Sequence, residues 1–301
     1  MTLLWIPLTI AAAFLQNVRS ALQKHLKGRL GTTGATFVRF GYGFPVAIAY
    51  LLALVFIFDF ELPRLNPTFI GFVLMGGLAQ ITATALLVTL FDARNFAVGT
   101  TYSKTETIQA AMFALVFLGE TISLTATIGI LVSLAGVIAI SVAKGQGGVG
   151  DITQGWNKRA ALIGLASGGF FGIAAISVRG GSLSLGGDGF LVQAAFTLAV
   201  MLVFQTVVMG SYMAIRNASE LREVLAAWRV AMWVGASGAV ASIGWFTAMT
   251  IQNAALVRAL GQIELVFTIA ASVIVFREKI ARMELVGISL VVAGILILLL
   301  H

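Results

Sequence analysis

The sequence has no cysteine, only two histidines and only four prolines in 301 residues. Without cysteine, the chain forms neither a disulfide framework nor a thiolate metal site. The two histidines are far apart, and no HExxH motif, nucleophile elbow, P-loop or carboxylate cluster with metal-ligand spacing occurs. We therefore expect that the protein is not an enzyme, binds no cofactor or metal, and does not hydrolyse ATP to drive its activity.

Charged residues are also scarce. They make up 10% of the chain, whereas about a quarter of the residues in a soluble domain are charged. Hydrophobic residues make up 59%, and the mean hydropathy is +1.01. The predicted fold class is therefore an all-α polytopic membrane protein, with the lipid bilayer as its surroundings. The net charge of +7 then reflects basic residues in short loops, which orient a chain in a membrane, and not nucleic-acid binding.

Apolar stretches of about 20 residues, the length that crosses a bilayer, follow one another along almost the whole chain. They predict ten transmembrane helices: Leu3–Leu22, Phe37–Phe58, Pro67–Phe91, Asn95–Leu118, Ile122–Val142, Arg159–Val178, Phe190–Ala214, Val230–Ile251, Ala254–Phe276 and Met283–Leu300. A glycine-rich polar interval, residues 144–158, is predicted to be a linker. It separates a first five-helix unit, residues 1–143, from a second one, residues 159–301.

The chain also contains an internal repeat. The stretch Asn95–Glu120 recurs without gaps 158 residues later as Asn253–Glu278, so that Glu106 aligns with Glu264. The same offset continues along the chain and aligns Gly129 with Gly287 and Gly136 with Gly294. Because each unit has an odd number of helices, the two copies enter the membrane in opposite directions. We therefore predict two inverted-topology repeats around a central cavity, an arrangement common in secondary transporters.

Glu106 and Glu264 are the leading candidates for function. Ionisable groups inside a membrane are costly unless they face a bundle interior or a wet cavity, so they suggest a functional site. The two carboxylates are predicted to bind a substrate or to take up and release a coupling proton. The alternative is a buried ion pair with Lys104 or Arg258 that holds the helices together. Because the glutamate recurs while Lys104 aligns with Gln262, function is the preferred interpretation.

Several uncharged polar residues within the predicted helices are further candidates for contact with a substrate: Gln16, Asn17, Gln80, Thr84, Tyr102, Gln109, Trp245 and Gln262. Arg19 is a weaker candidate than Gln16 or Asn17, and Arg39 is expected to extend to the membrane interface. Glu120 is expected to cap the following helix. Gly164, Gly168 and Gly172 are spaced for close helix packing.

The two repeat endings, LGETISLTATIGILVSLAGVI and FREKIARMELVGISLVVAGIL, resemble those of the drug/metabolite transporter superfamily and specifically its EamA-type ten-helix exporters. The pattern of a Gly-Glu pair followed by two glycines is present as Gly119, Glu120, Gly129 and Gly136. In the second copy Arg277 replaces the first glycine. Many members have a proline just after the recurrent glutamate. Thr107 and Leu265 occupy that position here, so the resemblance does not extend to the helix kink that this proline produces.

A closer likeness to YddG-like amino-acid exporters implies efflux of aromatic and apolar amino acids, including methionine, across a bacterial inner membrane by alternating access. The expected partners are a small-molecule substrate and the lipid bilayer, and the two carboxylates suggest proton coupling. Because two pseudo-symmetric halves already enclose a site, a monomer is expected. Two basic groups beside two glutamates match a zwitterion better than a phosphorylated solute. A multidrug or cationic-compound exporter is the alternative within the fold. A membrane-embedded enzyme or a channel is the alternative from another class.

The basic residues also bear on orientation. Thirteen lysines and arginines lie in loops after odd-numbered predicted helices, and only Arg64 and Arg179 lie in loops after even-numbered ones. The positive-inside rule then places both termini outside the cell. The family resemblance implies the opposite, with both termini in the cytoplasm. The sequence therefore allows both orientations.

Overall fold

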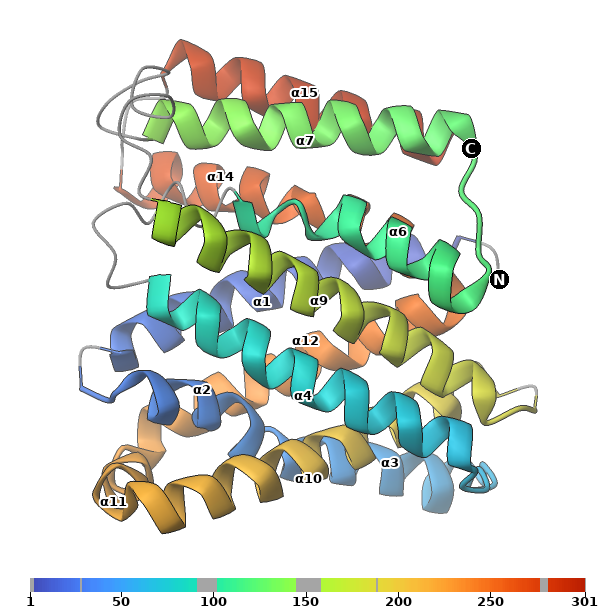
Figure 1. Ribbon diagram of the computed structural model, residues 1–301, viewed down its shortest axis with the longest axis vertical. Coiled ribbons are helices and arrows are strands. Elements are labelled where there is room, and N and C mark those ends of the chain that lie inside the picture. The colour runs from blue at the N-terminus through green and yellow to red at the C-terminus, as the bar shows by residue number, and fades with distance from the viewer. Residues whose placement is uncertain are drawn as a thin grey trace.

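The computed structural model describes residues 3–27, 29–90, 102–144, 158–187, 189–276 and 281–300. Every regular element in these ranges is a helix (Figure 1). The elements are α1 (Trp5–Lys27), α2 (Thr32–Gly41), α3 (Phe44–Ile57), α4 (Pro67–Leu90), α6 (Glu106–Leu118), α7 (Leu124–Lys144), α9 (Lys158–Ser184), α10 (Phe190–Arg216), α11 (Ala218–Ala226), α12 (Trp228–Ile251), α13 (Ala254–Leu260), the short 3₁₀ helix η1 (Gly261–Ile263), α14 (Glu264–Phe276) and α15 (Arg282–Leu299).

Seven helical stretches in the described ranges are long and apolar enough to cross a membrane: Thr32–Ile57, Pro67–Leu90, Leu124–Ser141, Arg159–Ser184, Phe190–Arg216, Trp228–Ile251 and Arg282–Leu299. Large apolar side chains such as Phe56, Val116 and Leu124 are exposed on the outside of the bundle. An apolar exterior of this kind is expected where lipid tails replace water as the solvent. The chain is therefore a multi-pass helical membrane protein, and the count of ten helices stays a prediction.

Two of the predicted helices, the fourth and the ninth, are interrupted at the recurrent glutamates, and this corrects the prediction of continuous helices. The predicted helix Ala254–Phe276 consists of α13, η1 and α14, and α14 begins at Glu264. The described part of the predicted helix Asn95–Leu118 has a turn at residues 104–105, after which α6 begins at Glu106. Both recurrent glutamates thus occupy the first position of a half-helix. The physical reason is that a carboxylate there complements the positive end of the helix dipole.

The second predicted helix also differs from its prediction. It begins at Thr32 instead of Phe37, and it is broken between α2 and α3 at Tyr42 and Gly43. Pro45 stands in the first turn of α3, where its missing N–H is tolerated. The helix α11 was not predicted. Asn217 caps it by accepting a hydrogen bond from the Glu220 amide at 3.3 Å.

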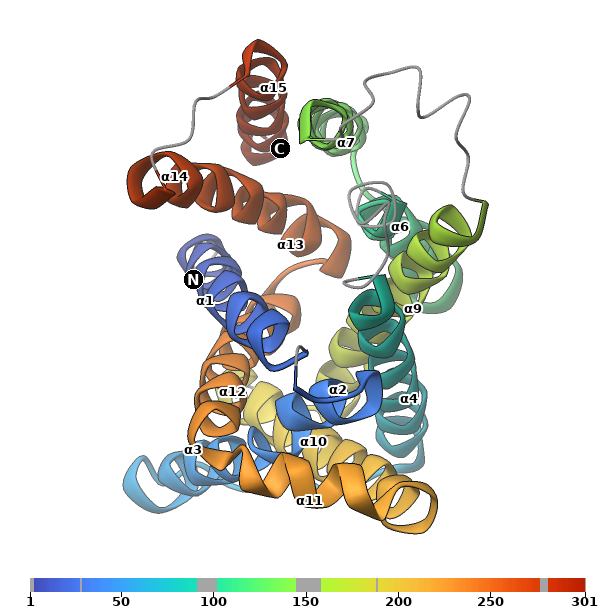
Figure 2. The same cartoon turned by 90° about the vertical axis from the view of Figure 1, so that its left-hand side faces the viewer.

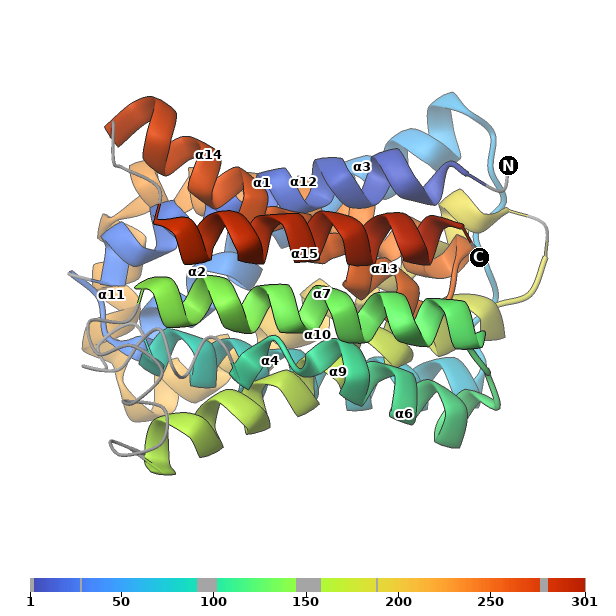
Figure 3. The ribbon, with the colours of Figure 1, turned by 90° about the horizontal axis from the view of Figure 1, so that it is seen from above.

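The helices stack along the long axis of the molecule (Figure 1). The pair α7 and α15 lies at one end of this axis, and α3, α10 and α11 lie at the other. In the view of Figure 2, α1, α13 and α14 are on one side of the middle, and α4, α6 and α9 are on the other. Both termini lie at the same face, opposite α11 (Figure 3). Residues 145–157 of the predicted linker and residues 95–101 of the predicted fourth helix fall outside the described residues.

Glycines that the repeat relates to each other hold α7 against α15. A Cβ on Gly136 would lie 2.6 Å from the carbonyl oxygen of Gly287, and a Cβ on Gly129 would lie 2.7 Å from that of Gly294. The two contacts are equivalent by the repeat. The offset of 158 residues relates Gly129 to Gly287 and Gly136 to Gly294, so it converts one contact into the other. Backbones this close leave no room for a side chain, so glycine is required at the crossing. This equivalence supports the prediction of two related repeats.

Candidate functional site

A cavity of about 390 Å³ lies in the middle of the bundle. Its wall is formed by α1, α2, α4, α7, α9 and α12 together with the segments around both interrupted helices. This volume is at the small end of the roughly 300–1,000 Å³ typical of ligand pockets. The cavity therefore has room for a small solute, and the groups on its wall determine which kind.

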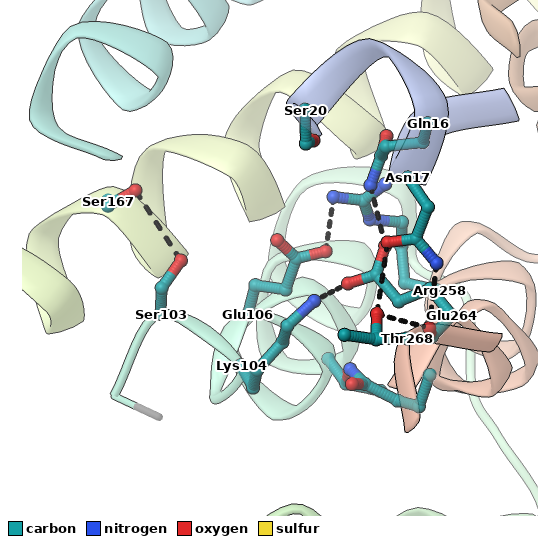
Figure 4. A network of polar contacts seen from close by, with 12 residues as sticks. Gln16, Asn17, Ser20, Ser103, Lys104, Glu106, Ser167, Arg258, Glu264 and Thr268 are labelled. Atoms are coloured by element: carbon teal, nitrogen blue, oxygen red, sulfur yellow. Dashed lines mark hydrogen bonds and ion pairs between the residues drawn. The ribbon is translucent and has the colours of Figure 1, made fainter. Parts of the chain in front are cut away.

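Two ion pairs cross the cavity between the repeats (Figure 4). Lys104, just before α6, pairs with Glu264 at the start of α14. Arg258 on α13 pairs with Glu106 at the start of α6. Each acid is therefore neutralised by a base from the other repeat, and both glutamates are buried. The ion-pair alternative in the sequence analysis is present in the structure, and it lies within the same cavity wall as the candidate site.

The carboxylate of Glu264 is also held by α1. Gln16 donates a hydrogen bond from Nε2 to Oε2 of Glu264 at 2.9 Å, and Asn17 donates from Nδ2 to its carbonyl oxygen at 2.8 Å. Thr268, one turn along α14, donates to the same carbonyl oxygen at 2.9 Å. Figure 4 shows Gln16, Asn17 and Thr268 converging on Glu264. The first helix of one repeat is thus tied to the half-helix of the other.

Gln262 and Thr107 link the two half-helices directly. Nε2 of Gln262 donates to Oγ1 of Thr107 at 2.9 Å, and both side chains are buried. Thr107 stands at the position where the family resemblance leads us to expect proline, and it supplies a hydroxyl in place of the proline ring. The helix is interrupted here without a proline, and this hydrogen bond joins the two repeats at the interruption.

Two arginines that the sequence analysis set aside also line the cavity. Arg19 is 5% exposed and Arg39 is 8% exposed. The prediction that Arg39 extends to the membrane interface is wrong, because its NH1 donates to Oγ1 of Thr84 at 3.0 Å inside the bundle. The signal that identifies both residues is their charge within an apolar helix. Arg19 also lies one helical turn beyond Gln16, on the same face of α1.

Aromatic side chains form an apolar part of the wall. Trp245 and Phe171 line the cavity, and the guanidinium of Arg258 lies 4.9 Å from the ring centroid of Trp245 and 5.8 Å from that of Phe171. At these distances the ring faces attract the cation. Phe171 therefore contacts both the cavity and its ion pair. The aromatic wall holds Arg258 in position beside Glu106.

The structure brings eight of the eleven predicted site residues to the cavity wall: Gln16, Asn17, Gln80, Lys104, Glu106, Trp245, Gln262 and Glu264. The other three lie away from it. Thr84 accepts the hydrogen bond from Arg39, Gln109 donates to Thr105 at 2.8 Å, and the carbonyl of Tyr102 accepts from Thr105. Contact between any of the eleven and a substrate stays a prediction. Ser20, Ser103 and Ser242 also line the cavity but were not predicted.

A second polar network lies near the face of the molecule that contains both termini. Arg179 donates from Nε to Oε1 of Glu120 at 2.5 Å and from NH1 to the carbonyl of Met249 at 2.9 Å. Asn253 donates to Oε2 of Glu120 at 2.7 Å. The expectation that Glu120 caps α7 is therefore wrong, and Ser123 accepts the hydrogen bond from the Ala126 amide instead. Arg179 lies within α9 and not in a loop.

Comparison with known proteins gives one family and one fold. The model of the EamA-like transporter family matches residues 3–142. No curated protein matches the chain. One solved structure, described only as the crystal structure of a protein, superposes with a TM-score of 0.72 and 17% sequence identity, covering 99% of this chain and 95% of that one. At that identity the likeness shows a shared fold over essentially the whole chain.

Proposed function

Because the chain belongs to the EamA-like transporter family, we propose that it is a secondary transporter that exports an amino acid or a similar small metabolite across a bacterial inner membrane by alternating access. The observation that carries this proposal is the single cavity wall that holds two carboxylates, basic groups and aromatic rings together. An amino acid has a carboxylate, an ammonium group and a side chain, and each finds a complementary group there. Apolar side chains such as those of methionine and phenylalanine match the wall formed by Phe171 and Trp245.

The half-helices support a site at mid-membrane. In transporters with repeats, substrates bind near the membrane midplane, where discontinuous helices direct their N-terminal ends at the site. Here α6 and α14 both begin at a cavity-lining glutamate. Because the ion pairs join the repeats, rocking of one repeat against the other changes the distances between Lys104, Glu106, Arg258 and Glu264. A substrate or a proton that replaces one partner then shifts the balance between the two states.

The network of Glu120, Arg179 and Asn253 supports closure at one end. Arg179 follows Val178, and the Met249 carbonyl that it contacts belongs to a residue of the cavity wall. We infer that the network closes the cavity toward the face of the termini. The offset of the repeat relates Asn253 to Asn95 and Glu120 to Glu278, which lie outside the described residues.

The experiment that tests the proposal is uptake of labelled methionine and phenylalanine into proteoliposomes, with and without a pH gradient. We expect saturable flux that Glu106→Gln and Glu264→Gln lower at least tenfold, whereas the exposed Glu223→Gln leaves it unchanged. Dependence on the gradient would support proton coupling. Full flux in both cavity variants would contradict the role of the glutamates. Flux that lipophilic cations block and amino acids do not would favour the cationic-compound exporter.

Replacing one glutamate leaves its basic partner unpaired, so folding must be checked in the same preparations. The paired variant Glu106→Gln with Arg258→Gln removes both charges together. It should be folded and still transport poorly, because the loss of transport follows from the missing carboxylate and not from an unpaired charge.

A further inference from the structure

The charges around the cavity do not balance within the part of the chain that the structure describes. The wall carries four basic side chains and two carboxylates: Arg19, Arg39, Lys104, Arg258, Glu106 and Glu264. Each carboxylate forms its ion pair with one base, Lys104 or Arg258. Arg19 and Arg39 have no acidic partner among the described residues, so two positive charges remain without a counter-charge. Buried charges are strongly unfavourable unless they are paired.

The guanidinium of Arg19 has hydrogen-bond donors without a partner. Its only hydrogen bond among described residues runs from NH2 to Oγ of Ser20 at 3.3 Å, which is long. Its Nε and NH1 are buried and have no hydrogen-bond partner. Buried donors nearly always have partners, so unpaired donors at a cavity wall indicate a group that binds there. A guanidinium remains charged at any physiological pH, and its donors are arranged to bind an oxyanion with two parallel hydrogen bonds.

Arg39 lies next to Arg19 on the same side of the cavity. Both side chains pass Gly238 on α12, where an added Cβ would lie 3.0 Å from Cδ of Arg19 and 3.8 Å from Cγ of Arg39. Arg39 uses NH1 for its bond to Thr84. Two cations this close repel each other. An anion in the cavity beside both of them would relieve this repulsion.

We propose that Arg19 and Arg39 form a docking site for an oxyanion group of the transported solute, a carboxylate or a phosphate, and that the cavity therefore selects solutes that carry such a group. This inference rests on the proposed transport function and narrows its substrate class. The carboxylate of an amino acid or of a small organic acid supplies the missing negative charge. A lipophilic cation would add to the repulsion between the two arginines.

A purely structural role for Arg19 predicts the opposite behaviour on substitution. If Arg19 stabilised the bundle, Arg19→Gln would lower the temperature of unfolding. If Arg19 is instead a charge that stays unpaired until an anion binds, the same change removes an unfavourable buried charge. The temperature of unfolding then stays the same or rises. The unliganded protein therefore distinguishes the two roles before any solute is added.

The test uses the purified full chain in detergent and measures the shift of its unfolding temperature with succinate, inorganic phosphate, methionine and methionine methyl ester. Such anions also stabilise proteins without binding to a site, so the readout is the difference between variants at matched concentrations. We expect saturable stabilisation by succinate, by phosphate or by both, and at least a tenfold loss of apparent affinity in Arg19→Gln. Arg222→Gln, an exposed arginine on α11, is the matched control and should respond like the wild type.

The outcomes separate this inference from the function on which it rests. A response to succinate alone identifies a carboxylate site, and a response to phosphate alone identifies a phosphate site. The same affinity in wild type and Arg19→Gln, or a stronger response to the methyl ester than to any anion, would overturn the inference. Anion binding that depends on Arg19 without flux of any amino acid would support the docking site and overturn amino-acid export. If Arg19→Gln does not fold, Arg39→Gln takes its place in the same assay.

Discussion

Glu106 forms its ion pair with Arg258 and not with Lys104, although Lys104 lies two residues away in the chain. Lys104 pairs instead with Glu264, the residue that the repeat aligns with Glu106. The two pairs therefore cross between the repeats. As a result, both carboxylates are neutralised only while the repeats stay in register with each other, and any motion between the repeats acts on both pairs at once.

The crossed pairs predict strong coupling in stability. Arg258→Gln should lower the free energy of unfolding by about 3–5 kcal/mol, because it leaves Glu106 buried and unpaired. The double variant with Glu106→Gln should lose less than the sum of the two single variants, with a coupling of about 1–3 kcal/mol. Thermal or denaturant unfolding of the four proteins in the same detergent measures the cycle. Additive losses would mean that the pair does not contribute as a unit.

The close crossing of α7 and α15 predicts a second effect on stability. Gly136→Leu places a side chain where a Cβ would already lie 2.6 Å from the carbonyl oxygen of Gly287. Overpacking of this kind costs about 1–3 kcal/mol and forces the helices apart. Gly71→Leu is the matched control, because nothing lies within 4 Å of a Cβ at that exposed position. Equal unfolding temperatures for the two variants would contradict the packing described here.

The sequence alone was sufficient for the helical membrane class and for the two central carboxylates. Hydropathy identifies membrane helices without any knowledge of how they pack. The recurrence of a glutamate at positions 106 and 264 likewise identifies equivalent sites in the two repeats without any knowledge of the residues that contact them. The pairing of charges was not predictable. The choice between Lys104 and Arg258 depends on how two repeats approach in space, and the members of each pair are more than 150 residues apart in the chain.

The position of Arg39 illustrates why errors at helix ends matter for a membrane site. The predicted helix began at Phe37, which put Arg39 in its first turn and suggested the interface. The structure begins that helix at Thr32, so Arg39 lies deeper and reaches the cavity. The interrupted helices were missed for a different reason. Neither Thr107 nor Leu265 is a proline, and the contact of Gln262 with Thr107 at the break joins residues that are far apart in the chain.

The basic residues predict how the chain is oriented. In the structure α11 and the last turns of α1 and α10 lie at the face opposite the termini (Figure 1). Arg179 belongs to α9 and not to a loop. Of the two basic residues assigned to loops after even-numbered predicted helices, only Arg64 therefore lies in a loop. We therefore expect Ser219→Cys on α11 to face the cytoplasm and Glu61→Cys near α4 to face outward.

The absence of native cysteine makes this orientation directly measurable, since each variant carries a single thiol. In intact cells, a membrane-impermeant maleimide should label Glu61→Cys and should label Ser219→Cys only after permeabilisation. The reverse pattern would place both termini in the cytoplasm, as the family resemblance implies. That result would also mean that the excess of basic residues does not orient this protein.

The last prediction concerns the network that joins Glu120, Arg179 and Asn253. Arg179→Gln removes the donor that binds both Glu120 and the Met249 carbonyl, so the end of the cavity near the termini should open more often. Ser242→Cys places a single thiol on the cavity wall as a reporter. From the face of the termini, an impermeant maleimide should label this thiol at least tenfold faster in the Arg179→Gln background. Arg64→Gln, an exposed arginine at the same face, should not change the rate. Equal rates in the two backgrounds would mean that the cavity is closed at this end by helix packing and not by the network.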